Sequence, residues 1–198
     1  MADIKLYFPH LLKWEGGFVQ DIADAGGATN MGVTISTFKA HGYDNDGDGD
    51  IDVEDLRKQS PEQAQAICKP FYWDRWKADN IKSQAVAETL VEWVWGSGKW
   101  GIVIPQRIMG LVDDGIVGPK TLEAVNKQDP AVFHEKIRMA KMSFIDGIVV
   151  ASINRYKEKN PSATEKELMT YTNKRFEKGW KNRINDFKYE PNTNATGV

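Results

Sequence analysis

One glutamate, Glu15, has a position in the sequence that suits a proton donor. It follows Ile4 by eleven residues, and eleven steps of about 100° return to nearly the same side of a helix. The side chain therefore extends an apolar stripe at the C-terminal end of the helix, just before Gly16 and Gly17. Partial burial and the helix dipole both favour a protonated carboxyl, the form that protonates the leaving oxygen in glycoside cleavage. The alternative is an ordinary solvated glutamate in a last helical turn.

Polar side chains soon after this glutamate supply the other groups that such a reaction needs. Asp21 and Asp24 offer a second carboxylate, which would stabilise positive charge at the sugar carbon or position a water molecule. Thr29, Asn30 and Thr34 add hydroxyl and amide groups that can hold a water or a sugar substituent. We therefore predict that Asp24 or Asp21 assists catalysis and that the other three residues contact substrate.

An acidic loop, residues 44–55, has oxygen donors at the spacing of a calcium-binding loop. Counted from Asp44, donors stand at positions 1, 3, 5, 9 and 12, with glycine at position 6 and an aliphatic residue at position 8. Position 12 is Asp55 in place of the longer glutamate, so the expected affinity is modest. We expect a structural calcium ion that braces the fold, and a plain solvated loop is the alternative. The predicted ligands are Asp44, Asp46, Asp48, Asp50, Asp52 and Asp55.

Composition excludes several classes of protein. The 198 residues carry a formal net charge of −2, so no overall field attracts nucleic acid or an anionic membrane. Cys68 is the only cysteine, which excludes an intrachain disulfide, and the three histidines lack the spacing of zinc ligands. The N-terminal segment has no uninterrupted apolar run of the signal-peptide type, and no segment reaches transmembrane length. We therefore expect synthesis in the cytoplasm, no stable membrane insertion and no catalytic metal.

Hydrophobic spacing and helix caps predict a mainly helical fold with a small β-hairpin. The first helix ends at Gly16, and the glycine-rich segment 18–34 follows as a loop and hairpin. Ser60, Pro61 and Gln63 combine an N-cap, a first-position proline and a capping-box partner at one helix start. Further helices are expected at about 36–41 and 83–95, from Pro119, from 130 to about 152, and from about 164 through Phe187. Residues 191–198 are expected to form a disordered tail.

Three short strings around Glu15 carry a resemblance to a known family. They are Trp14–Phe18, Asp21–Asp24 and Gly26–Thr34, and together they resemble family 108 of the glycoside hydrolases, a set of lysozyme-like N-acetylmuramidases. The resemblance implies a mainly α, α+β lysozyme-like fold with a small hairpin near the active site, and it gives Glu15 the place of the catalytic glutamate. The order of residues also looks like that of phage-type lysozymes, in which a threonine stands at the position of Asn30.

The same resemblance extends along the first half of the chain. It continues through Phe71–Asp74 and Glu92–Gly98, so we predict a catalytic domain over residues 1–100 that includes the acidic loop. Trp93 and Ser97 are candidate sugar contacts in the second of these strings. Core packing is the alternative role for the tryptophan, because Trp is usually well buried.

The second half of the chain carries a different resemblance. The strings Ile104–Arg107 and Asp114–Thr121 are similar to the predicted peptidoglycan-binding domain commonly found after these catalytic domains. The resemblance implies a helical peptidoglycan-binding domain over residues 101–190, packed on the first domain. A well-made turn and helix start is the alternative meaning of the second string.

The leading prediction is a peptidoglycan hydrolase, an N-acetylmuramidase that cleaves the bond between N-acetylmuramic acid and N-acetylglucosamine with Glu15 as the acid. It would act at the bacterial cell wall, in the periplasm or outside the cell, after a holin or an export partner has released it. The first alternative is a non-catalytic peptidoglycan-binding or secretion-assisting protein that keeps the lysozyme-like fold. The second is a calcium-responsive interaction module in which Glu15 is incidental.

Overall fold

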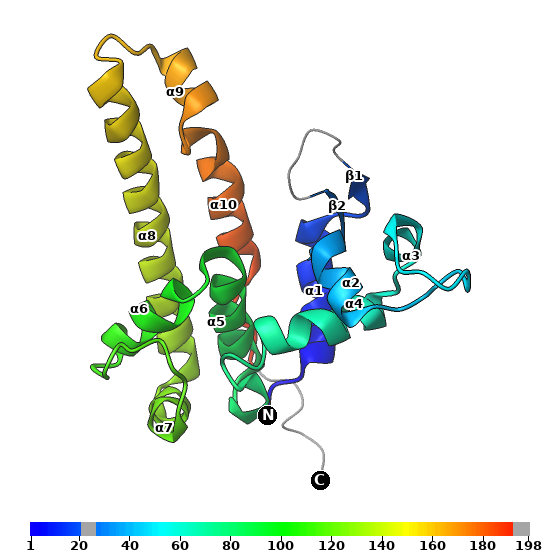
Figure 1. The fold of residues 1–198 in the computed structure, drawn as a ribbon. Coiled ribbons are helices and arrows are strands. Elements are labelled where there is room, and N and C mark those ends of the chain that lie inside the picture. The colour runs from blue at the N-terminus through cyan, green and yellow to red at the C-terminus, as the bar shows by residue number, and fades with distance from the viewer. Residues whose placement is uncertain (21–26, 192–198) are drawn as a thin grey trace. The chain divides into compact units, whose positions relative to one another are not determined.

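The computed structural model describes residues 1–20 and 27–191, which form two compact units (Figure 1). The N-terminal unit spans Met1–Asn80, and the C-terminal unit begins at Ile81. Helices dominate both units, and a small antiparallel sheet belongs to the N-terminal unit. The expected mainly α fold with a small β element is therefore confirmed. The domain division at residues 100 and 101 stays a prediction, and residues 192–198 of the expected tail lie outside the described part.

The N-terminal unit combines helices with three short strands in the antiparallel order β1-β2-β3. The expected hairpin thus supplies two of the three strands of a sheet. The strands are β1 (Val19–Gln20), β2 (Ala28–Asn30) and β3 (Val33–Thr34). The helices are α1 (Ile4–Glu15), α2 (Ile35–His41), α3 (Val53–Arg57) and α4 (Pro61–Cys68), and the short 3₁₀ helices are η1 (Lys69–Phe71) and η2 (Ala78–Asn80).

Helix α1 begins and ends at local signals in its sequence. The side chain of Asp3 accepts a hydrogen bond from the N–H of Lys5 at 2.8 Å and caps the helix start. Gly16 has φ 71° and ψ −175°, a backbone conformation that is essentially restricted to glycine, so the helix ends directly after Glu15. The face that packs into the core carries Ile4, Tyr7, Phe8 and Leu11.

Helix α4 has the predicted capping box. Gln63 N–H donates to the Ser60 hydroxyl, and the Gln63 side chain accepts from the Ser60 N–H at 2.9 Å. The chain then turns through η1 to Trp73, whose ring is fully buried and packs at 5.8 Å from the ring of Tyr7 in α1. This contact holds the segment after α4 against the first helix.

The C-terminal unit is helical throughout its described residues. Its helices are α5 (Gln84–Ser97), α6 (Trp100–Ile108), α7 (Pro119–Lys127), α8 (Pro130–Lys159), α9 (Glu165–Tyr171) and α10 (Lys174–Asp186). Figure 1 shows α8 and α10 side by side, and Ile145, Val149 and Ile184 form a buried cluster between them. None of the described helices has a stretch that is long and apolar enough to cross a membrane.

Helices α5 and α6 approach each other closely at Gly101. A Cβ atom at this position would lie only 2.4 Å from the backbone nitrogen of Val94, so only glycine allows this approach. Helix α5 extends to Ser97 and packs against α6. This packing is the reason that α5 belongs to the same compact unit as α6.

A buried carboxylate joins three helices of this unit. Glu92 on α5 is 3% exposed and forms ion pairs with Lys141 on α8 and with Arg183 on α10. The Arg183 Nε lies 2.7 Å from Glu92 Oε1. Removing one member of such a group would leave a buried charge without compensation, so the network fixes which faces of α5, α8 and α10 meet.

The prediction of one continuous last helix from about residue 164 to Phe187 is wrong. Thr172 separates α9 from α10 with an extended backbone, φ −122° and ψ 171°. Its buried hydroxyl donates to the carbonyl of Leu168 at 2.6 Å and accepts the N–H of Lys174 at 3.2 Å, which satisfies the ends of both helices. Helix α8 also runs past the expected end near residue 152, because stacking between Tyr156 and Tyr171, at 5.7 Å, ties its last turns to α9.

The turn before α7 is held by one buried glutamine. Gln106 on α6 is 1% exposed, and its amide nitrogen donates to the carboxylate of Asp114 and to the carbonyl of Ile116, both at 3.0 Å. Its amide oxygen accepts the N–H of Gly115 at 2.9 Å. The turn in the Asp114–Thr121 string therefore has a structural role.

We expect Gln106→Ala to lower the free energy of unfolding by about 1–3 kcal/mol, because a buried side chain that makes three hydrogen bonds to the turn is removed. Denaturant titration followed by circular dichroism would measure the change. Gln128→Ala is the matched control, since Gln128 is half-exposed and makes one hydrogen bond to the carbonyl of Ala124. Equal losses in the two variants would contradict the structural role of Gln106.

Candidate functional site

Glu15 is the last residue of α1, and its carboxyl group is only partly accessible. The side chain is half-buried, and Oε1 is fully covered by protein atoms. Gly16 then turns the chain away from the helix axis, so that the covered carboxyl stands at the helix end. The sequence predicted a partly desolvated position, and the structure confirms this burial.

Two side chains from the end of α4 and the segment after it lie within electrostatic reach of Glu15. Burial raises the pKa of the Cys68 thiol to about 12, and the charge of Glu15 adds to this effect. Burial likewise raises the pKa of the Tyr72 hydroxyl, with a further contribution from Glu15, while Arg75 opposes it. Both groups are uncharged near neutral pH. The carboxyl group of Glu15 therefore has a thiol and a phenol among its neighbours.

These two neighbours were not assigned to the site from sequence. Cys68 is buried, with 5% of its surface exposed. The sequence pattern of α4 marks Cys68 as an inward-facing position but does not indicate what it faces. Tyr72 lies in the Phe71–Asp74 string, which carried part of the family resemblance. That string was the sequence signal from which Tyr72 could have been assigned to the site.

The sheet separates the three polar candidates of the glycine-rich segment onto two faces. Thr29 on β2 pairs with Val19 on one side and with Thr34 on the other, so the two threonines are cross-strand neighbours on one face. Asn30 points the opposite way, is 3% exposed, and donates to the carbonyl of Leu56 at 2.8 Å. In this arrangement Asn30 braces α3 and is turned away from solvent.

The threonines differ in how much of their hydrogen-bonding capacity is already used. The Thr34 hydroxyl caps α2 by accepting the N–H of Thr37 at 3.3 Å. Thr29 is half-exposed, and its partner in the sheet is Val19. Val19 lies four residues after Glu15, so the backbones of Glu15 and Val19 are at most roughly 14 Å apart. Thr29 is thus the best-placed polar group on this face to meet a ligand bound at Glu15. The predicted catalytic partners Asp21 and Asp24 lie outside the described residues.

The two candidates in the C-terminal unit have different environments. Trp93 is completely buried, and its ring packs edge-on against Phe144 at 6.0 Å, so core packing accounts for this residue. Ser97 is half-buried at the last position of α5. Trp100, at the start of α6, is 41% exposed and is the more accessible ring in this part of the unit.

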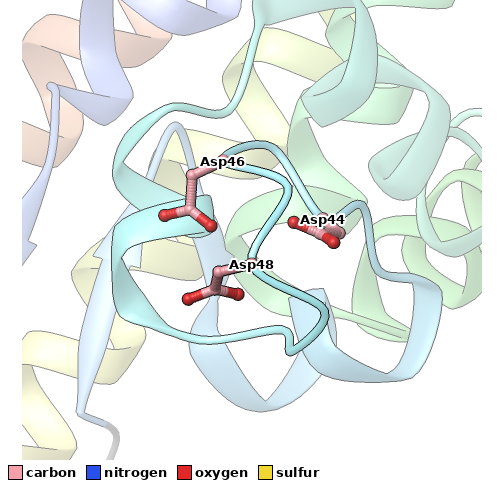
Figure 2. Close-up of side chains that lie close together, drawn as sticks. All are labelled: Asp44, Asp46 and Asp48. Atoms are coloured by element: carbon pink, nitrogen blue, oxygen red, sulfur yellow. The ribbon is translucent and has the colours of Figure 1, made fainter.

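The acidic loop brings its carboxylates together in two groups. Asp44, Asp46 and Asp48 form one exposed group, shown in Figure 2, with one oxygen from each carboxylate within 4.8 Å of the others. Asp50, Asp52 and Asp55 form the second group by the same measure. Hard oxygen atoms at this spacing are a suitable donor set for calcium.

Asp55 holds the loop in shape. Its side chain is buried and accepts the N–H groups of Asn45 at 2.6 Å, Asp46 at 3.2 Å and Asp52 at 2.8 Å. These hydrogen bonds keep the pKa of the Asp55 carboxyl below its usual value, and the one from the Asp52 N–H has the largest effect. In contrast, the carboxylate of Asp48 raises the pKa of Asp50, as expected for neighbouring like charges.

Comparisons with known proteins divide the chain into two matched regions. Residues 8–98 match the family model of glycosyl hydrolase 108, and residues 100–185 match the model of the predicted peptidoglycan domain. Among solved structures, SagA of Brucella abortus is similar, with a TM-score of 0.64 and 24% sequence identity over 92% of this chain and 90% of that one. At this identity the likeness concerns the fold. No curated protein sequence matches the chain.

We expect the thiol of Cys68 to be unreactive in the native protein, because the side chain is 5% exposed and its pKa is about 12. An aromatic disulfide reagent at neutral pH should label the native chain only as fast as it unfolds, and should label the denatured chain at once. Cys68→Ser is the blank for the absorbance readout. Rapid labelling of the native protein would contradict the covered position beside Glu15.

Proposed function

Since residues 8–98 belong to the glycosyl hydrolase 108 family and residues 100–185 to the predicted peptidoglycan domain, we propose that this chain hydrolyses the glycan strands of bacterial peptidoglycan. Both assignments support a lysozyme-like protein that acts on peptidoglycan. The bond that we propose for cleavage joins N-acetylmuramic acid to N-acetylglucosamine. The group that we propose as the acid is the carboxyl of Glu15.

The proposed chemistry starts with the protonated carboxyl of Glu15. It would donate its proton to the glycosidic oxygen as the bond to the sugar carbon breaks. Positive charge then develops on the sugar ring, and a second carboxylate stabilises it or positions the attacking water. Asp24 or Asp21 is the proposed second carboxylate, and the hydroxyl of Thr29 is a proposed contact to the water or the sugar.

The observation that carries this proposal is the covered position of Glu15 at the end of α1. One carboxyl oxygen is covered by protein, and the neighbours Cys68 and Tyr72 are uncharged near neutral pH. The C-terminal end of a helix also presents negative partial charge. A carboxyl group held at a helix end with one oxygen covered by protein supports a role as proton donor.

Action on peptidoglycan places the proposed site of function at the bacterial cell wall, in the periplasm or outside the cell. A holin or an export component is the proposed partner for reaching it. The non-catalytic alternative would use the same location and would bind the wall without cutting it.

A structural calcium ion in the acidic loop remains a separate proposal. The group of Asp44, Asp46 and Asp48 supplies oxygen donors of the right hardness, and Asp50, Asp52 and Asp55 lie in the same loop. Asp55 already ties the loop together through three backbone N–H groups. An ion would relieve repulsion among the remaining carboxylates and would thereby strengthen the same loop.

We expect Glu15→Gln to keep the fold and to lower peptidoglycan hydrolysis by at least about 100-fold, because glutamine cannot donate the proton. The measurement is the release of new reducing ends at muramic acid, identified by mass spectrometry of the products. Glu123→Gln is the matched control, since Glu123 is exposed on α7 and pairs with Lys127 in the next turn.

Undiminished hydrolysis by Glu15→Gln would remove Glu15 as the acid. If the wild-type protein binds peptidoglycan but releases no new reducing ends, the non-catalytic alternative replaces the enzyme proposal.

For the loop, we expect calcium to raise the thermal unfolding midpoint of the protein, and Asp48→Asn to reduce the effect. With calcium about 100-fold above its Kd, the stabilisation would be about 2.7 kcal/mol. Magnesium is the control ion, because it requires a smaller octahedral site, and Asp113→Asn is the control variant. An unfolding midpoint that does not respond to calcium would eliminate the structural ion.

A further inference from the structure

The first half of α8 borders an open, mostly apolar groove on the C-terminal unit. The groove has a volume of about 670 Å³. Val132 and Met139 both line it and are 54% and 56% exposed, so the groove presents large apolar side chains to solvent. Its lining residues are Ile108, Ala131, Val132, Glu135, Lys136, Met139 and Ala140.

A polar pocket adjoins this groove across the same helix. It has a volume of about 260 Å³, and it shares Ala131 and Glu135 with the groove, so the two hollows meet along α8. The rest of its lining is His134 and Arg138 from α8, and Asn185, Lys188 and Tyr189 from the end of α10 and the segment after it. We refer to the groove and pocket together as the α8 surface.

Hydrogen bonds fix the polar groups of the pocket. Arg138 donates to both carboxylate oxygens of Glu135 at 2.7 Å, so this pair is locked and its charges cancel. Arg138 also donates to Oδ1 of Asn185 at 2.9 Å, which leaves the Asn185 amide nitrogen as the donor. Nε2 of His134 lies 3.0 Å from the carbonyl oxygen of Phe187 and must donate to it. Burial lowers the pKa of His134, so the ring is neutral near pH 7.

Two exposed lysines give the α8 surface an excess of positive charge. Lys136 lines the groove and Lys188 lines the pocket. Neither ammonium group forms an ion pair with another residue in the described part of the chain. With Arg138 balanced by Glu135 and His134 neutral, the two lysines are the uncompensated charges. The surface therefore complements a ligand that carries carboxylates.

We propose that the α8 surface binds the peptide stem of peptidoglycan, an acidic peptide with small apolar side chains. Methyl groups of the peptide would lie in the groove beside Val132 and Met139, and a carboxylate would accept hydrogen bonds from Lys188 and Asn185. This proposal rests on peptidoglycan as the substrate and adds that the C-terminal unit recognises its peptide part.

The lining of the groove favours a peptide over a glycan strand. Sugar rings are commonly held by stacking on the flat face of an aromatic side chain, and the lining residues of the groove include none. In the pocket, the ring of Tyr189 packs against His134 at 5.7 Å. Small aliphatic side chains and Met adapt to a narrow apolar ligand of variable shape. The two hydrogen bonds between Arg138 and Glu135 fix the orientation of these side chains where groove and pocket meet.

The test uses the full chain with Glu15→Gln, so that no ligand is cut. Calorimetry would compare a soluble stem peptide that ends in a free carboxylate with a chitin-type oligosaccharide that has no peptide. We expect binding of the peptide that weakens with added salt, and a loss of roughly fivefold in affinity on Lys188→Ala. Val132→Asp should also weaken binding, because it places a negative charge beside the ligand. Lys178→Ala is the matched control, an exposed lysine on α10 away from both hollows.

Equal peptide affinity in all four proteins would overturn the proposal, as would binding of the oligosaccharide alone. Sedimentation of the same variants gives a second readout. If the chain self-associates and Val132→Asp abolishes the association, the groove is an interface between copies and the peptide site is rejected. If the wild-type protein releases no new reducing ends but the Glu15→Gln protein binds the peptide, only the muramidase proposal fails. If the wild-type protein hydrolyses peptidoglycan but the peptide does not bind, only the proposal for the α8 surface fails.

Discussion

The point at which α1 ends is the constraint on which the N-terminal unit depends. Gly16 adopts a backbone conformation that other residues avoid, so the helix ends directly after Glu15 and the chain turns into β1. The same stop leaves the Glu15 carboxyl at the helix end, where the end of α4 and Tyr72 surround it. If α1 were one turn longer, Glu15 would lie within the helix and not at its end. Strand β1, which pairs with Thr29, would then begin farther from Glu15 along the chain.

The C-terminal unit depends on a different kind of interaction. Glu92, Lys141 and Arg183 place opposite charges in a buried position where three helices meet. Such a group adds little net stability but strongly disfavours other helix pairings, because any other pairing would bury a charge alone.

Local signals in the sequence predicted many elements correctly, and interactions between distant residues account for the errors. The capping box at Ser60 and the proline at the start of α7 act within one helical turn, so they could be recognised directly. The break at Thr172 was missed because apolar spacing continues across it, while the hydroxyl of Thr172 satisfies the ends of both helices. Trp93 was a candidate sugar contact until its packing against Phe144 showed a core position.

For the candidate site, the sequence by itself determined the residue types and the stop that leaves Glu15 at a helix end, because these depend on neighbours in the chain. The acidic loop was also readable, since its donors follow one another at fixed spacing. Only the tertiary structure decided that Cys68 and Tyr72 are the neighbours of Glu15, that Asn30 faces inward, and that two hollows meet on α8. These features depend on how segments far apart in the chain pack together, and packing leaves no regular pattern in the order of residues.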